Sequence, residues 1–170
     1  MCGIVGYIGT HQAAPVLLDG LAKLEYRGYD SAGIAVYDGE KIRMEKAVGR
    51  LKVLEELTQD GATLPGTVGI GHTRWATHGV PSDLNAHPHF NHDHSIVVVH
   101  NGIIENYLKL KKKLAGKGYE FLSETDTEVI AHMLDYYYKG DPLDAISKVM
   151  HRMEGSYGLG IMFRDHPDEV

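Results

Sequence analysis

The sequence predicts an α+β domain built on antiparallel strands. Its clearest signal is the Asp38-Gly39 pair, which separates two short β-prone segments at residues 34–37 and 42–44 and therefore indicates a hairpin. Segments with helical spacing of apolar residues occur both before and after this hairpin. Because a hairpin makes its two strands antiparallel, the pattern argues against a doubly wound parallel sheet. With 170 residues, we expect one domain over residues 1–170 with a core of its own.

The first half of the chain is predicted to combine two helices with glycine-rich strands. Residues 4–8 carry an apolar run with interleaved glycines, which is typical of a short buried strand. The other elements expected in this half are a helix over residues 15–26, a glycine-bracketed polar loop over 26–33, the hairpin strands, a short helix over 51–57 and a strand over 68–72.

The second half alternates strands and helices after a long irregular segment. Residues 81–95 lack periodicity, as functional or disordered loops do. We expect a buried strand over 96–99 that stops at 100–102, helices over 107–116, 125–138 and 142–150, and a strand over 159–163. Thr125 and Glu128 form a predicted capping box at the middle helix. The last strand has no later partner, so we expect the natural domain to continue beyond residue 170.

Composition excludes several classes of function. Seventeen basic against twenty-three acidic residues give a net charge of −6, which argues against a nucleic-acid-binding surface. The sequence has no run of eighteen apolar residues and no basic-then-apolar leader, so we expect neither a membrane span nor a signal peptide. The single cysteine rules out an internal disulfide and favours a reducing, cytoplasmic compartment.

Cys2 is the first candidate for catalysis. Methionine aminopeptidase normally removes a methionine that precedes a small residue, and loss of Met1 would leave a cysteine with a free α-amine. A thiol titrates near pH ~8.5 and an α-amine near ~7.7–8, so the amine can take the thiol proton without a histidine. The other interpretation is that Cys2 is only a small buried hydrophobic residue.

Three further positions suit an amide hydrolase. The Asn101-Gly102 pair follows a buried strand, where an amide side chain and an open backbone N–H can converge on an oxyanion. Arg74 and Asp126 carry opposite charges that could hold the two ends of an amino acid. Each position also has a plainer interpretation. Asn101-Gly102 would be an ordinary turn, Arg74 would be solvated, and Asp126 would be an acid favoured by the dipole at the start of a helix.

Histidines in the irregular segment raise the question of a metal. His87, His89, His92 and His94 fall within eight positions, and His-x-His spacing can chelate. No cysteine is near, and Pro88 stiffens the first pair. We therefore expect no metal site and interpret these histidines as solvated or hydrogen-bonding side chains.

Five segments together resemble one family: residues 2–6, 24–33, 72–79, 100–106 and 123–128. They are similar to the class II glutamine amidotransferase domain of the isomerizing glutamine:fructose-6-phosphate aminotransferases, the glucosamine-6-phosphate synthases. The resemblance covers essentially all 170 residues. Amidophosphoribosyltransferases and asparagine synthetases share the Cys-Gly start and the Asn-Gly pair, whereas residues 26–30 and 74–78 resemble the sugar-phosphate enzymes.

The resemblance implies an N-terminal-nucleophile hydrolase fold, an αββα sandwich of two antiparallel sheets between helical layers. By the same resemblance, Cys2 is the nucleophile, and Asn101 with Gly102 forms the oxyanion hole. Arg74 is then expected to hold the α-carboxylate of glutamine and Asp126 its α-ammonium.

Other residues receive roles from the resemblance as well. Thr77 and His78 are expected to line the substrate pocket. Trp75 belongs to a loop that closes over glutamine and gates the passage of ammonia. His87 lies in a family motif, residues 85–88, to which we assign a structural role. No cofactor is implied.

The function implied is hydrolysis of glutamine to glutamate and ammonia through a cysteinyl thioester. In the family, a sugar isomerase domain follows the glutaminase domain, binds fructose 6-phosphate and makes glucosamine 6-phosphate. The partners expected are therefore glutamine and the protein's own isomerase domain, in a full-length enzyme that is a homo-oligomer, with neither nucleic acid nor membrane.

Two other functions fit some of the same residues. An N-terminal cysteine amidase acting on a different amide would share the chemistry of Cys2 but would not need Arg74 and Asp126 together. A metal-binding or regulatory module would use Cys2 only as a structural residue. If the α-amine were not the base, His78 or His100 would be the next candidates.

Overall fold

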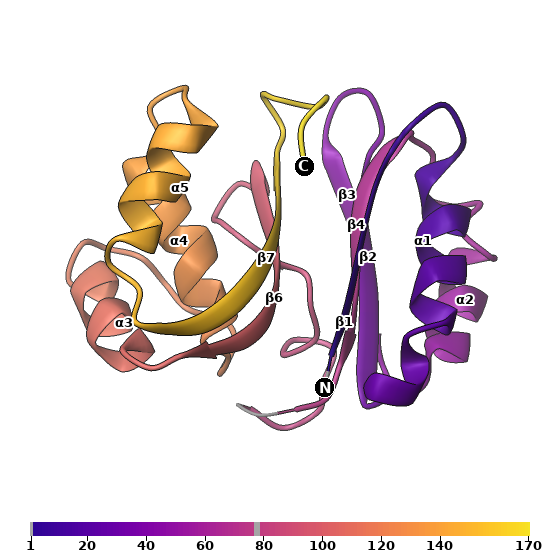
Figure 1. Ribbon diagram of the computed structural model, residues 1–170, viewed down its shortest axis with the longest axis horizontal. Coiled ribbons are helices and arrows are strands. Elements are labelled where there is room, and N and C mark those ends of the chain that lie inside the picture. The colour runs from indigo at the N-terminus through magenta and orange to yellow at the C-terminus, as the bar shows by residue number, and fades with distance from the viewer. Residues whose placement is uncertain (1, 77–78) are drawn as a thin grey trace.

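The computed structural model describes residues 2–76 and 79–170 and contains two antiparallel sheets packed face to face between layers of helices (Figure 1). The first sheet has the strand order β1 (Gly3–Ile8), β4 (Val68–Arg74), β2 (Ser31–Tyr37), β3 (Ile42–Val48). The second has the order β5 (His89–Phe90), β6 (Ile96–Ile104), β7 (Gly155–Phe163). The predicted α+β sandwich is confirmed.

Helices cover the outer faces of both sheets. On the first sheet lie α1 (Ala13–Ala22) and α2 (Leu51–Thr58), and on the second lie α3 (Tyr107–Ala115), α4 (Thr127–Tyr137) and α5 (Pro142–Met150) (Figure 1). A single 3₁₀ turn, η1 (Glu25–Arg27), follows α1. None of the helices in the described part of the chain has the length and apolar character needed to cross a bilayer.

Two glycines explain how closely α1 packs on β4. A Cβ at Gly69 would lie 2.8 Å from Leu17 Cδ1, and one at Gly71 would lie 3.0 Å from Leu21 Cδ1. The small residues on this face of β4 therefore let the helix approach the backbone of the strand. Side chains on its opposite face, such as Ile70, are buried between the sheets against residues of β6 and β7.

The register of β1 and β4 places the start of the chain beside the end of β4. Gly3 pairs with Thr73, so Cys2 lies level with Arg74 at the end of the molecule where β1 begins (Figure 1). From the second sheet, β6 contributes Asn101, whose side-chain amide reaches the backbone of Cys2. Strands from both sheets thus bring polar residues to one end of the sandwich.

Several boundaries differ from the prediction. The Asp38-Gly39 hairpin is confirmed, with Tyr37 paired to Ile42 across a four-residue connection in which Asp38 Oδ1 accepts the N–H groups of residues 40 and 41. The first helix ends at Ala22 instead of residue 26, and β2 begins at residue 31 instead of 34. Strand β6 does not stop at residues 100–102 but continues to Ile104, because β7 pairs with it along its whole length.

The predicted capping box at α4 is wrong. The helix begins at Thr127, and its N-cap residue Asp126 makes no side-chain capping bond. Thr125 Oγ1 instead lies 3.1 Å from His89 Nε2. Glu128 does reach back, but to the N–H groups of Leu122 and Ser123, each at 2.7 Å. A sequence window cannot show this, since the competing partner of Thr125 lies in a distant strand.

Candidate active site

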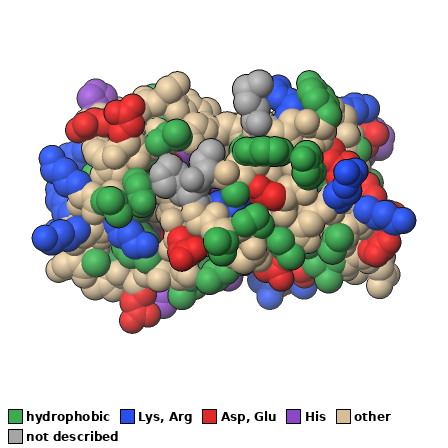
Figure 2. Space-filling view, turned by 90° about the horizontal axis from the view of Figure 1, so that it is seen from below, with side chains coloured by type: hydrophobic (Ala, Val, Ile, Leu, Met, Phe, Trp, Pro, Cys, Tyr) green, Lys and Arg blue, Asp and Glu red, His purple; other side chains and the backbone are tan. Residues whose placement is uncertain are grey.

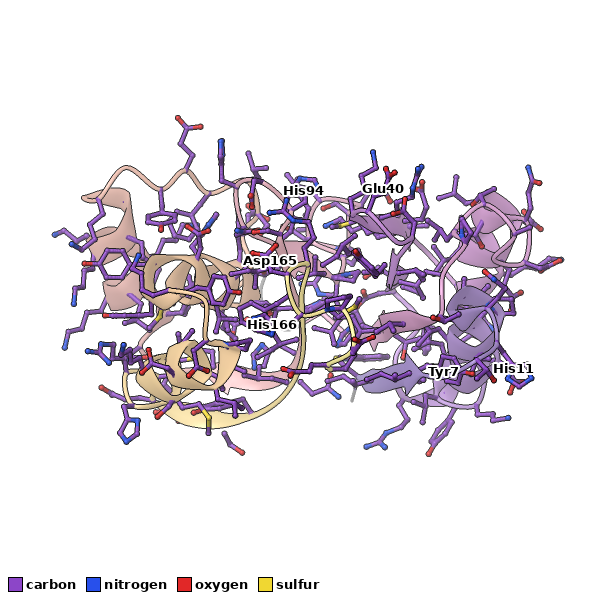
Figure 3. The ribbon with its side chains drawn as sticks, turned by 90° about the horizontal axis from the view of Figure 1, so that it is seen from above. Tyr7, His11, Glu40, His94, Asp165 and His166 are labelled. Atoms are coloured by element: carbon purple, nitrogen blue, oxygen red, sulfur yellow. The ribbon has the colours of Figure 1, made fainter. Side chains whose placement is uncertain are left out.

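A pocket of about 490 Å³ lies at the end of the molecule where β1 begins. Six of the eight predicted site residues line it: Cys2, Arg74, Trp75, Asn101, Gly102 and Asp126. The other two, Thr77 and His78, lie outside the described residues. Figure 2 views this end and shows hydrophobic side chains scattered among charged ones. The turns at the opposite end, which carry Glu40, His94 and Asp165, contribute nothing to this pocket (Figure 3).

Cys2 is half-buried and faces the backbone that follows β4. The N–H of Trp75 donates to Cys2 Sγ at 3.2 Å, and the Trp75 carbonyl oxygen lies 3.5 Å from the same sulfur. This environment differs from that of an inert cysteine in an apolar core. A thiol on the wall of a pocket that it shares with Arg74 and Asp126, in contact with a backbone donor, is available for nucleophilic chemistry.

Asn101 and Gly102 lie inside β6, which excludes the interpretation of an ordinary Asn-Gly turn. Asn101 Nδ2 donates to the carbonyl oxygen of Cys2 at 3.2 Å, so the amide nitrogen lies next to the backbone of Cys2. Gly102 has a φ of 125°, and a Cβ there would lie 2.1 Å from the carbonyl oxygen of Ser156 on β7. Both the backbone conformation and the close approach of β7 require glycine at this position.

Arg74 is only 3% exposed, so the interpretation of a solvated arginine is wrong. Its Nη2 donates to the carbonyl oxygen of Gly79 at 3.0 Å, across the segment that contains the two undescribed residues. Burial lowers the pKa of Arg74, while Asp30, Cys2 and Asp126 act in the opposite direction by favouring its charged form. A buried guanidinium at a pocket wall is a suitable partner for a carboxylate.

Asp126 is 4% exposed and has a role that a helix dipole does not explain. Its Oδ2 accepts the backbone N–H of Ile104 at 2.9 Å, which ties the start of α4 to the end of β6. Its Oδ1 lies 4.0 Å from His100 Nδ1. The carboxylate is therefore fixed in direction, and it lines the same pocket as Arg74.

The segment between η1 and β2 supports the backbone that leaves β4. A Cβ at Gly28 would lie 2.8 Å from the carbonyl carbon of Arg74, and the carboxylate of Asp30 accepts the N–H of Ala76. The ring of Tyr29 meets that of Trp75 edge-on at 5.4 Å between centroids. In the sequence, residues 28–30 were notable only for the family resemblance. Their contacts show that they support the backbone that follows β4.

Four buried histidines in or beside the pocket wall were not identified as a group from the sequence. They are His72, His87, His89 and His100, which come from β4, the irregular segment, β5 and β6. His87 Nε2 and His100 Nδ1 lie 2.8 and 3.0 Å from Thr127 Oγ1. For His72, the sequence signal was a polar residue inside a strand with apolar or glycine neighbours.

The loop histidines do not gather around a common point. His87 and His89 face the hydroxyls of Thr127 and Thr125, whereas the ring of His94 packs on Phe90 at 3.9 Å between centroids. Among residues 2–76 and 79–170, no three His, Cys, Asp or Glu side chains are arranged to hold a metal ion.

Comparison with known proteins gives a consistent family. A family model described as "Glutamine amidotransferase domain" matches residues 72–169. The chain is 61% identical over all its 170 residues to "Glutamine--fructose-6-phosphate aminotransferase [isomerizing]" of Caldanaerobacter subterraneus subsp. tengcongensis, and 53% identical to the protein of that name from Thermus thermophilus. In both cases it spans 28% of the relative's length.

Solved structures agree with the fold. The glutamine phosphoribosylpyrophosphate amidotransferase of B. subtilis superimposes with a TM-score of 0.81 at 30% identity, covering 96% of this chain and 35% of the other. A structure described as the allosteric regulatory enzyme of purine biosynthesis gives 0.82 at 32% identity, with 96% and 36% covered. Together with the pocket and its residues, these matches establish that the chain belongs to the glutamine amidotransferase domain family.

Proposed function

We propose that this domain hydrolyses glutamine to glutamate and ammonia through a thioester on Cys2. The observation that carries the proposal is the grouping of a nucleophile, a buried cation and a buried anion around one pocket: Cys2, Arg74 and Asp126 all line it. A volume of about 490 Å³ accommodates an amino acid of this size.

The charges explain why glutamine is the substrate proposed. Arg74 would bind the α-carboxylate through its planar fork, and Asp126 would accept from the α-ammonium. These contacts leave the side-chain amide directed at Cys2. An amide without the α-carboxylate and α-ammonium would leave both buried charges without their counterparts, which is unfavourable.

The chemistry follows from the groups around Cys2. The thiolate attacks the amide carbon, and the oxyanion that forms would be stabilised by Asn101 Nδ2 and the Gly102 N–H. The α-amine of Cys2, having taken the thiol proton, gives it to the departing nitrogen, which leaves as ammonia. Water, deprotonated by the same amine, then attacks the thioester and releases glutamate, which restores the thiol.

The full-length protein would use this ammonia elsewhere. We propose that it is passed to an isomerase domain that binds fructose 6-phosphate and makes glucosamine 6-phosphate, within a homo-oligomeric enzyme. The support is the identity of 51–61% to proteins named isomerizing aminotransferases, of which this chain spans 28%. A cytoplasmic location is part of the proposal because a catalytic thiol must stay reduced.

The test compares the rates at which different amides are hydrolysed and measures covalent labelling of Cys2. Glutamine should be hydrolysed far faster than asparagine or simple acyl amides, and a glutamine-shaped chloroketone should modify Cys2 with one equivalent. A Cys2→Ala variant should lose both activities. Equal rates for all amides would favour an amidase of different specificity, and a tightly bound stoichiometric metal without labelling would favour a metal-binding module.

A further inference from the structure

His72 lies near the end of β4 and contacts the amide of Asn101. It is fully buried on β4, between the two sheets. Its Nε2 lies 2.9 Å from Asn101 Oδ1 and 3.1 Å from the carbonyl oxygen of His100, both on β6. Because a backbone carbonyl oxygen only accepts hydrogen bonds, Nε2 must be the nitrogen that carries the proton.

The ring of His72 is neutral under ordinary conditions. Burial lowers the pKa of His72 to about 4, and its hydrogen bonds to Asn101 and His100 offset only part of that effect. A neutral imidazole has a single N–H. His72 is therefore held in one tautomer, with its N–H at Nε2 and pointing at β6.

This tautomer decides which way the Asn101 amide faces. An N–H from His72 requires the oxygen end of the amide on its side, which leaves Nδ2 on the side of Cys2. The hydrogen bond on the other side of the amide agrees with this orientation, since Asn101 Nδ2 donates to the Cys2 carbonyl oxygen at 3.2 Å. A reversed amide would place Oδ1 against that carbonyl oxygen and Nδ2 against the His72 N–H, which are two repulsive contacts.

The ring of His72 is itself fixed by packing against a second histidine. It stacks on the ring of His87, with centroids 4.1 Å apart and an angle of 27° between the planes. His87 in turn lies 2.8 Å from Thr127 Oγ1 on α4. The orientation of Asn101 thus depends on a chain of packed side chains that joins β4 to the start of α4.

We propose that His72 is a positioning residue for the oxyanion hole, which fixes Asn101 so that its Nδ2 faces the reacting carbonyl. This inference rests on the proposed glutaminase function. Because a donor aimed in advance acts mainly in the transition state, losing the alignment should lower kcat more than it changes KM. We expect a loss of about 10–100-fold, smaller than the ~10²–10³ for removing an oxyanion donor.

The test compares two substitutions at His72 with a control at another buried histidine. His72→Phe removes the donor but keeps an aromatic ring, whereas His72→Gln retains an N–H that can reach Asn101 and should restore part of kcat. His132→Phe is the matched control, because His132 is 4% exposed and packs on Tyr119 and Phe121, away from the pocket. The control should leave kcat within about twofold of the unaltered enzyme.

A double-mutant cycle separates this inference from the function on which it rests. In an Asn101→Ala background, His72→Phe should cause no further loss of kcat. If Asn101→Ala lowers kcat but His72→Phe does not, the positioning role is overturned while the glutaminase proposal stands. If Asn101→Ala has no effect, the oxyanion role fails and the inference fails with it.

A measurement on the unaltered protein covers the case in which His72→Phe does not fold. ¹⁵N NMR of the imidazole distinguishes the two neutral tautomers. A proton on Nε2 of His72 supports the inference, and a proton on Nδ1 overturns it.

Discussion

At the scale of single residues, the pocket combines Asn101 and Gly102, which are positioned by strand β6, with Asp126, which lies at the start of helix α4. Asn101 and Gly102 owe their positions to the register of β6 against β7, in which they pair with Gly158 and Tyr157. Asp126 owes its direction to the N–H of Ile104. Groups held by regular backbone keep their geometry when substrate binds, as electrostatic catalysis requires.

Asn101→Ala should reduce turnover far more than binding. In the proposed mechanism the side chain stabilises an oxyanion that is absent from the bound substrate, so kcat should fall by about 10²–10³ while KM changes little. Steady-state kinetics with glutamine measures both quantities. A proportional loss of binding and turnover would contradict the role assigned to Asn101.

Arg74→Lys should raise the KM for glutamine. An ammonium cannot reproduce the bidentate contact of a guanidinium with a carboxylate. Arg164→Lys, on a side chain that faces Asp93 at the opposite end of the molecule, serves as the control. Unchanged glutamine kinetics in the Arg74 variant would remove this residue from the binding site.

Retention of Met1 should abolish activity. The α-amine of Cys2 would then be an amide nitrogen, which is not basic, and the thiol would lose its proton acceptor. Intact mass and glutaminase activity should be measured on the same samples, including one with a residue inserted between Met1 and Cys2 to block processing. Full activity in unprocessed protein would redirect attention to His78 or His100 as the base.

At the scale of elements, the sequence predicted helices and the hairpin better than strand ends. The helices over 107–116 and 142–150 were found within one residue, because periodicity and the Asp141-Pro142 start are local signals. The end of β6 was missed because Asn-Gly usually marks a turn, whereas here nine residues of β7 pair with the strand. Tertiary pairing overrode a local preference.

Gly102→Ala should destabilise the β6–β7 pair. The added Cβ would meet the Ser156 carbonyl oxygen at 2.1 Å on a backbone with positive φ, which should cost about 2 kcal/mol or more and lower Tm by about 5 °C or more. Gly158→Ala is the stability control, since a Cβ there has no neighbour within 4 Å. Equal midpoints for the two variants, measured by thermal unfolding, would contradict this account.

At the scale of the whole molecule, the site is assembled from segments that are far apart in the sequence. Each of the candidate site residues Cys2, Arg74, Asn101 and Asp126 was identifiable from local motifs and a resemblance. The grouping of the buried histidines was not, because His72 and His87 meet only through contact between β4 and a segment fifteen residues later. Such contacts depend on how two sheets face each other, which no sequence window contains.

Stability should fall in mild acid because of these histidines. Burial lowers the pKa of His72 to about 4 and the pKa values of His87 and His89 well below 6.5. The unfolded chain therefore takes up protons first, and the stabilisation, complete above pH 6.5, declines as the pH falls towards 4. His72 alone accounts for about 3 kcal/mol over that window, at ~1.4 kcal/mol per pKa unit.

Denaturant unfolding at a series of pH values measures this effect. The free energy of unfolding should decrease steadily between pH 6.5 and 4. A constant value from pH 6.5 to 5 would mean that the histidines are equally easy to protonate in the folded and unfolded chain.

The pairing of Gly3 with Thr73 also determines how long the N-terminus stays unpaired during synthesis, when Met1 can be removed. Strand β1 is an edge strand whose pairing partner in the sheet, β4, is made about seventy residues later. At translation rates of about 5–20 residues per second, β1 has nothing to pair with for several seconds after it leaves the ribosome. During that interval the terminus stays open to an aminopeptidase, so Met1 can be removed, and the α-amine that we propose as the base exposed, before the strand pairs and the pocket forms around it.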